Sequence, residues 1–322
     1  MTWLVTGGAG YIGSHVAREL QSAGMSVVVL DNLSTGVREF VPAEVPFVQA
    51  DLLDTVSVRE ALSNHSVKGV IHIAGFKFAG ISVEKPLHTY EQNVTAIMSL
   101  LRAMEAVGVR KIVFSSSSSV YGNAAEGLVT EDDPFNPTSP YGESKVIGEW
   151  LLRNEGVAHG LVHTSLRYFN VVGSGDSSLP DVSPYNLLSM VFAGLENNRV
   201  PEIFGDDYDT PDGTCIRDYI HVSDLAKAHV GAATRMDQGE PIESAYNLGS
   251  GTGTSVAEMM SAISRVTGID FSPKIGARRA GDPARVVASG DRASRDIGWS
   301  MTHSLDDMIH SAFEARKHLP SA

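Results

Sequence analysis

The sequence is poor in several features, and each shortage excludes a class of protein. Its 322 residues include a single cysteine, Cys215. One cysteine cannot form an internal disulfide bond, so we expect a reducing, cytoplasmic environment. No apolar run approaches the roughly 18 residues that a transmembrane helix requires, and we expect no membrane partner. No basic stretch precedes the first predicted strand, so we expect no targeting segment.

Positive charge is also scarce. The chain has 25 lysines and arginines against 38 aspartates and glutamates, which gives a formal net charge of −13. Such a charge repels nucleic acids and anionic membranes, and we expect no nucleic acid as a partner. An anionic small molecule is compatible with it where local arginines override the overall field. The 11 histidines show no paired spacing typical of metal ligands, so we expect no metal.

The first half of the chain alternates short β-branched runs with helical patterns, which is typical of a parallel sheet covered on both faces. Strands are predicted over 3–6, 26–30, 47–49, 69–73, 111–115 and 161–168, and helices over 12–23, 56–63, 90–107 and 142–154. Apolar residues recur at helical spacing in the third of these helices and form a stripe that is either core packing or a dimer face: Val94, Ile97, Leu101, Met104 and Val107.

Beyond Asn170 the pattern loosens. The sequence predicts loops over 173–183 and 205–213 and helices over 187–195, 255–267 and 305–318. We therefore expect an α/β fold in which a doubly wound parallel sheet is followed by a smaller C-terminal α/β domain. The expected domains are 1–170, with a return segment near 218–233, and 171–322.

A glycine-rich stretch, Val5-Thr6-Gly7-Gly8-Ala9-Gly10-Tyr11-Ile12-Gly13, follows the first predicted strand and opens a helix. Gly7 allows a tight turn, and Gly10 lets the backbone approach a pyrophosphate. Gly13 permits close packing of the helix on the strand. The free N–H groups of the helix N-terminus attract phosphates. The stretch predicts a dinucleotide-binding Rossmann domain.

Two aspartates bear on the choice of dinucleotide. Asp31 ends the second predicted strand, 18 positions after Gly13. A carboxylate there accepts hydrogen bonds from ribose hydroxyls and repels a 2′-phosphate, which favours NAD over NADP. Asp51 follows the third strand, where it either reaches the adenine or caps a loop.

Tyr141 and Lys145 lie four residues apart, on one face of a predicted helix. Free tyrosine has a pKa of roughly 10. A neighbouring ammonium favours the phenolate and lowers that pKa, which makes tyrosine a usable base. Most such pairs are solvated surface, but here the pair shares a chain with a dinucleotide motif.

The glycine motif, Tyr141-x-x-x-Lys145 and Ser117 together resemble the extended short-chain dehydrogenase/reductase superfamily. Dehydratases of that superfamily resemble one another in an Asp-Glu pair just after the serine, and related decarboxylases carry a glutamate there. This chain has Ser118 and Ser119 instead. Both of those activities are therefore disfavoured.

Ordered blocks over nearly the whole chain resemble the UDP-glucose 4-epimerase family. They cover 6–13, 30–33, 70–75, 84–87, 93–94, 120–122, 139–142, 166–170, 203–208, 212–222, 246–249 and 278–283. The most discriminating is Asp212-Gly213-Thr214 ahead of Arg217-Asp218. The resemblance implies an isomerase that interconverts UDP-glucose and UDP-galactose through a transient 4-keto sugar.

The resemblance also implies roles for residues. Tyr141 takes the proton of the sugar 4-hydroxyl, Lys145 lowers the tyrosine's pKa and holds the nicotinamide ribose, and Ser117 bonds the 4-oxygen. NAD contacts are implied for Gly7, Gly10, Tyr11, Ile12, Gly13, Asp31, Asn32, Asp51, Leu52, Ile73, Ala74, Gly75, Lys77, Asn93, Ser117, Tyr141, Lys145, Tyr168 and Phe169. Substrate contacts are implied for Ser117, Tyr141, Asn170, Phe204, Arg217, Arg279 and Asp282, the two arginines on the diphosphate. A homodimer through the helices over 90–107 and 142–154 is implied as well.

Two departures from the family pattern leave alternatives open. Where many relatives carry a substrate-contacting asparagine-leucine pair, Ser183 or Asn186 takes its place. Val286 falls where some relatives have a bulky tyrosine, and the smaller side chain would admit an N-acetyl group. The alternatives are a dual-specificity epimerase that also accepts UDP-N-acetylhexosamines, a UDP-glucuronate 4-epimerase, a dehydrogenase that releases NADH, and a non-catalytic NAD-binding protein.

Overall fold

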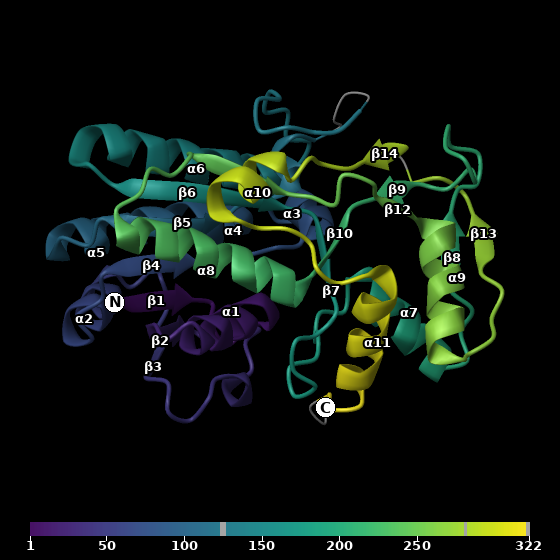
Figure 1. Ribbon diagram of the computed structural model, residues 1–322, viewed down its shortest axis with the longest axis horizontal. Helices are drawn as coiled ribbons and strands as arrows, with labels where there is room; N and C mark the ends of the chain where they lie inside the picture. Colours follow the sequence, from purple (N-terminus) through teal and green to yellow (C-terminus); the bar gives the residue numbers. More distant parts are fainter. Residues whose placement is uncertain (123–126, 280–281, 320–322) are drawn as a thin grey trace.

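A seven-stranded parallel sheet organises the computed structural model, which describes residues 1–122, 127–279 and 282–319 (Figure 1). The strand order is β11-β6-β5-β4-β1-β2-β3, and every pairing in it is parallel. The strands are β1 (Thr2–Thr6), β2 (Ser26–Asp31), β3 (Phe47–Gln49), β4 (Gly69–His72), β5 (Lys111–Ser115), β6 (Val162–Tyr168) and β11 (Ala245–Leu248). This topology confirms the expected doubly wound α/β fold.

Helices cover both faces of the sheet because both faces of its strands are apolar. On one face, α1 (Tyr11–Ser22), α8 (Val222–Gln238) and α10 (Asp291–Ile297) contribute to a core that includes Trp3, Val5 and Tyr246. On the other, α2 (Thr55–Asn64), α5 (Ala96–Val107) and α6 (Pro140–His159) contribute to a second core. The short helix α3 (Ala79–Glu84) packs against α6.

The predicted helix over 90–107 is interrupted. Helix α4 (Pro86–Tyr90) runs into a wide turn over Glu91–Thr95, and α5 follows. The turn is π-helical, and it carries Asn93, whose buried side chain bonds the backbone of Phe76 through both its amide nitrogen and its oxygen. The interruption thus coincides with a contact between distant segments, which a local sequence pattern does not reveal.

The apolar stripe of the same segment is core packing for three of its residues. Ile97, Leu101 and Met104 are buried in the second core, where α5 packs on α2. Val107 lies at the edge of that core, partly exposed. The stripe therefore faces the sheet of its own chain.

The chain returns to the large sheet after Asn170. Strands β7 (Asn170–Val172) and β10 (Tyr219–His221) pair in parallel, α8 then packs on α1, and β11 joins the sheet beside β6. Sequence analysis missed β11, which lies far along the chain from the other strands of the sheet and pairs with β6. In the described part of the chain, no helix is long and apolar enough to cross a membrane.

The remaining C-terminal elements form a separate unit, which lies to the right in Figure 1. Its own apolar core includes Phe192, Met259 and Ile309. The unit contains α7 (Leu187–Glu196), β8 (Glu202–Phe204), β9 (Ile216–Arg217), β12 (Thr254–Ser255), α9 (Val256–Thr267), β13 (Lys274–Gly276), β14 (Arg285–Val286) and α11 (Leu305–Arg316). Strands β8 and β13 pair with each other, and β9 lies between β12 and β14.

Helix α6 is fixed to the sheet by a buried ion pair. Arg167 on β6 donates two hydrogen bonds to Glu149 on α6, Nε to Oε1 at 3.0 Å and Nη2 to Oε2 at 2.6 Å. Both side chains are less than 10% exposed. Ser116 donates a further bond to the Glu149 carboxylate, and Arg167 also donates to the hydroxyl of Tyr121. The network satisfies both charges inside the protein.

We expect Arg167→Ala to lower the free energy of unfolding by about 3–5 kcal/mol, because it leaves the Glu149 carboxylate buried and unpaired. Chemical denaturation measures this change. The matched control is Arg295→Ala, which removes an exposed arginine paired with Asp296 and should change stability little. Equal effects of the two variants would contradict a structural role for the buried pair.

Candidate active site

The glycine-rich loop is built for close approach of backbone to backbone. Gly7 has a φ of +71°, and a Cβ there would lie 2.8 Å from the nitrogen of Ala74. A Cβ on Gly13 would lie 2.1 Å from the carbonyl oxygen of Gly7. Helix α1 begins at Tyr11 with Gly10 as its N-cap, and no side chain caps it. The loop therefore leaves helix N–H groups available to a phosphate, which fits a dinucleotide.

Asp31 ties the end of β2 to this loop. Its carboxylate accepts hydrogen bonds from the N–H of Ala9 at 3.0 Å and of Leu33 at 2.8 Å. Burial raises the pKa of Asp31, and these two bonds act in the opposite direction. Each oxygen has a lone pair left for a ribose hydroxyl, which fits the expected contact.

The other residues predicted to hold NAD gather around the ends of β2, β3 and β4. Asn32 donates to the carboxylate of Asp51 at 2.9 Å, so these two residues meet as a pair. The side chain of Leu52 is 7% exposed and belongs to the second core. Ile73 follows β4 and packs on the first core, although the sequence predicted it as the last residue of that strand.

Gly75, Lys77 and Asn93 lie together beyond β4. Gly75 has a φ of +155°, and a Cβ there would meet the side-chain oxygen of Asn93 at 2.9 Å. Asn93 also donates to the hydroxyl of Ser144 on α6, at 2.8 Å. Lys77 is solvent-exposed, yet the surrounding protein desolvates it enough to lower its pKa, and the charge of Asp181 acts in the opposite direction. An exposed but crowded lysine is typical of a cleft.

The three predicted catalytic residues converge where β5 ends and α6 begins. Lys145 donates a hydrogen bond from Nζ to the carbonyl of Ser115 at 2.8 Å, and its Nζ lies 5.8 Å from the centre of the Tyr141 ring. Ser117 is buried at the end of β5 and contributes a hydrogen bond that lowers the pKa of Tyr141. Tyr168, from β6, lies close by: burial raises the pKa of Tyr168, and the charge of Tyr141 raises it further.

The electrostatics of this group correct one expectation. Burial raises the pKa of Tyr141, and the bond from Ser117 offsets this only in part. Burial also lowers the pKa of Lys145 to about 8, against an opposing effect of Glu149. The pKa of Tyr141 therefore lies above its ordinary value, whereas sequence analysis predicted that the ammonium of Lys145 would bring it below. Desolvation dominates because both groups lie in a poorly solvated position.

The residues predicted to bind substrate occupy the C-terminal unit and its junction with the sheet. Arg217 forms an ion pair with Asp282 at 3.2 Å, and the guanidinium of Arg279 lies 3.9 Å from the centre of the Phe204 ring. Asn170 donates from its side chain to the carbonyl of Asp218 at 2.9 Å. Phe169 precedes it and packs beside Tyr121 and Val146. Ala280 and Gly281 of the Arg279 segment lie outside the described residues.

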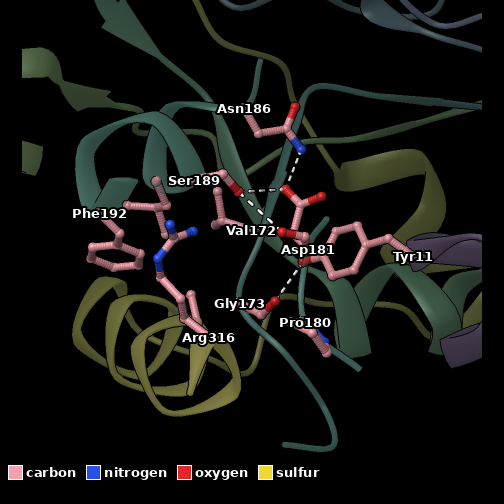
Figure 2. A pocket seen from close by; sticks show the side chains of 11 residues that line it. Tyr11, Val172, Gly173, Pro180, Asp181, Asn186, Ser189, Phe192 and Arg316 are labelled. Atoms are coloured by element: carbon pink, nitrogen blue, oxygen red, sulfur yellow. Dashed lines mark hydrogen bonds between the residues drawn. The ribbon is translucent and has the colours of Figure 1, made fainter. Parts of the chain in front are cut away.

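Figure 2 shows a third group of residues, around Asp181; sequence analysis named Tyr11 and Asn186 of this group but not Asp181 itself. The carboxylate of Asp181 accepts hydrogen bonds from the side chains of Asn186, at 2.5 Å, and Ser189, at 3.2 Å. Tyr11 of the glycine loop donates its hydroxyl to the carbonyl of Gly173 nearby. Asp181 stands in a predicted loop without any motif, so no local signal marks it. Among the described side chains, no group of three or more metal-binding residues is placed to hold a metal ion.

Comparisons with known proteins agree with this geometry. Residues 3–249 match the model of the NAD dependent epimerase/dehydratase family. The UDP-glucose 4-epimerase of Lacticaseibacillus casei is 40% identical over 327 residues, which cover 99% of this chain and 98% of the relative.

Solved structures resemble the chain equally well along its length. The Brucella ovis UDP-glucose 4-epimerase in complex with NAD has a TM-score of 0.93 at 39% identity, with 98% of each chain covered. The Bifidobacterium longum UDP-glucose 4-epimerase in complex with NAD⁺ and UDP has a TM-score of 0.89 at 36% identity, with 99% of each chain covered. The chain belongs to the NAD-dependent epimerase/dehydratase family and, within it, to the UDP-glucose 4-epimerases.

Proposed function

We propose that the protein interconverts UDP-glucose and UDP-galactose by NAD-dependent epimerisation at C4 of the sugar. The observation that carries this proposal is the convergence of Ser117, Tyr141 and Lys145 beside a loop that fits a dinucleotide. When bound, NAD⁺ accepts a hydride from C4, returns it to the opposite face of the sugar, and brings a positive charge to the site. Ser118 and Ser119 supply no carboxylate for elimination of water.

Within this mechanism Tyr141 accepts the proton of the 4-hydroxyl and returns it after the sugar has turned. The hydroxyl of Ser117 bonds the 4-oxygen as it becomes a carbonyl. Lys145, held by the carbonyl of Ser115, orients the nicotinamide ribose. Burial raises the pKa of Tyr141, and the positive charge that bound NAD⁺ would bring acts in the opposite direction and favours the phenolate.

Arginines of the C-terminal unit supply the diphosphate site. Arg217 and Arg279 present planar guanidinium groups, which suit phosphate oxygens. Their partners in this structure, Asp282 and the ring of Phe204, then face the uridine. These local arginines allow a chain of net charge −13 to bind a dianionic substrate.

The organisation around these sites follows the contacts of the chain. We propose that residues 1–170 form the NAD-binding domain together with the return segment near 218–233. Strand β11 and helix α10 also pack with the large sheet, which corrects the expected boundary, and the other residues of 171–322 form the sugar-nucleotide domain. We also propose a homodimer through the helices over 90–107 and 142–154. Trp150 in the second range is exposed, and so is Val157, which follows that range in α6. A cytoplasmic site of action suits the single cysteine, which is buried and free.

The experiment that tests the function incubates the purified protein with UDP-galactose and no added NAD. We expect UDP-glucose to form without net NADH, because the cofactor stays bound and is regenerated in each turnover. Chromatography follows the sugar nucleotides, and near-ultraviolet absorbance follows NADH. Accumulation of free NADH after addition of NAD would identify a dehydrogenase instead, and turnover of neither kind would leave a binding protein.

The role of Tyr141 is tested separately. We expect Tyr141→Phe to reduce turnover by about 10²- to 10⁴-fold, because the proton acceptor is lost while the ring stays in place. Thermal unfolding should be unchanged. Tyr90→Phe is the matched control, since it removes a tyrosine hydroxyl that bonds Glu143 near the protein surface. Full activity of Tyr141→Phe would mean that another group is the base.

A second substrate class is favoured by one position. Val286 on β14 pairs in register with Arg217, so it lies beside the proposed diphosphate site with a small side chain. We propose as the alternative that UDP-N-acetylhexosamines are also accepted. Turnover of UDP-N-acetylgalactosamine by the wild type is then expected, and Val286→Tyr should reduce it by about tenfold or more relative to UDP-galactose. No turnover of the acetylated sugar by the wild type would rule this alternative out.

A further inference from the structure

The segment 181–186 connects the two parts of the molecule, and hydrogen bonds fix it to the C-terminal unit. Asp181 accepts bonds from the backbone N–H of Ser183 at 2.9 Å and from the side chains of Asn186 and Ser189 (Figure 2). Ser189 lies in the first turn of α7, and Asn186 is the residue before that helix. The carboxylate therefore fastens the segment to the start of α7.

The same segment touches the sheet-bearing part through an aromatic pair. The ring of Tyr185 meets the ring of Phe78 edge to face, with centroids 4.9 Å apart and planes at 72°. Phe78 in turn packs edge to face on Phe76 at 5.4 Å, and Phe76 on His88 at 5.1 Å. Tyr185 is 57% exposed, so the contact contributes little to a hydrophobic core. Its place in the molecule gives a better reason for it.

That position is next to the segment that carries Tyr141. Phe78 is the N-cap of α3, and the hydroxyl of Ser82 in this helix accepts a hydrogen bond from the backbone N–H of Tyr141 at 3.2 Å. Lys77 is adjacent to Phe78, and the charge of Asp181 acts to raise the pKa of Lys77. The aromatic pair thus joins the segment that carries Lys77 to the segment that carries Asp181.

One polar group in the segment lacks a partner. The side-chain oxygen of Ser183 is buried and forms no hydrogen bond with the described part of the protein. A buried hydroxyl without a partner is less stable than a bonded one. A sugar or phosphate oxygen bound under the segment would satisfy it.

We propose that Phe78 and Tyr185 form a latch over the sugar end of the site, and that this latch retains the 4-keto sugar during its rotation. The inference rests on the proposed epimerisation. The latch residues are positioning residues, because they hold the segment 181–186 in place and do not take part in the proton or hydride transfer.

Retention matters because the intermediate can be lost. When C4 gives its hydride to NAD⁺ and the 4-hydroxyl gives its proton to Tyr141, the products are a UDP-4-ketohexose and enzyme-bound NADH. A ketone that escapes leaves one molecule of NADH on the enzyme, and that subunit stops turning over. A weakened latch should therefore raise the number of abortive events per turnover.

The test uses the whole enzyme with its own cofactor. Wild type, Phe78→Ala, Tyr185→Ala, the double variant and Tyr185→Phe are incubated with UDP-galactose. Epimerisation is followed by product chromatography. Released ketone is separated from protein by ultrafiltration and trapped by borodeuteride as UDP-hexose labelled at C4. NADH left on the enzyme is read by its near-ultraviolet absorbance.

We expect each alanine variant to release about two- to tenfold more ketone per turnover, with matching NADH on the enzyme, which is the range that one edge-to-face contact supplies. The double variant should leak no more than either single variant, because both remove the same contact. Tyr185→Phe keeps the ring and should behave as the wild type.

The outcomes separate the latch from the function. A wild type without turnover contradicts the proposed epimerisation itself. If the wild type turns over and the alanine variants release no more ketone than it does, the latch is overturned. It is also overturned if the increases of the two single variants multiply in the double variant. Because Tyr185 is exposed, Tyr185→Ala tests the latch even if Phe78→Ala does not fold.

Discussion

The buried ion pair between Glu149 and Arg167 is the interaction on which the rest of the site depends. It joins α6 to β6 and extends to Ser116, one residue before Ser117. Tyr141 and Lys145 lie on the first turns of the same helix. Their place against the end of β5 is therefore set by a network that is itself remote from the reacting atoms. A buried ion pair of this kind fixes register better than apolar contacts do, because its geometry is directional.

Desolvation gives this site its chemistry. It raises the pKa of Tyr141 and lowers that of Lys145, so for both groups burial favours the neutral form. A positive charge placed beside Tyr141 would act against this effect and favour the phenolate.

The site spans two structural units, and the chain crosses between them more than once. Strands β7 and β10 pair at the junction, where the side chain of Asn170 donates a hydrogen bond to the backbone carbonyl of Asp218. The carboxylate of Asp218 also accepts bonds from the N–H groups of Ser250 and Ala288. These bonds place Arg217 and Val286 at a defined position relative to the sheet, which a single flexible linker would not do.

Much of this was predictable because it is local. The glycine loop needs small residues at fixed spacing after a strand, and Tyr141 and Lys145 need only one helical turn between them. The alternation of strands and helices gave the doubly wound fold for the same reason. Ordered blocks of residues along the chain were enough to predict the family and, through that resemblance, the roles of Arg217 and Arg279.

Other features depend on contacts between distant segments, and only the tertiary structure decided them. Strand β11 is four residues long and becomes a strand by pairing with β6. The wide turn around Asn93 carries a side chain that bonds the distant Phe76, and the pKa of Tyr141 rises because the fold removes water from it. The contact of Phe78 with Tyr185 joins residues more than a hundred positions apart. The sequence by itself determined the motifs and their chemistry, whereas burial and long-range pairing, which depend on the whole chain, determined how those motifs meet.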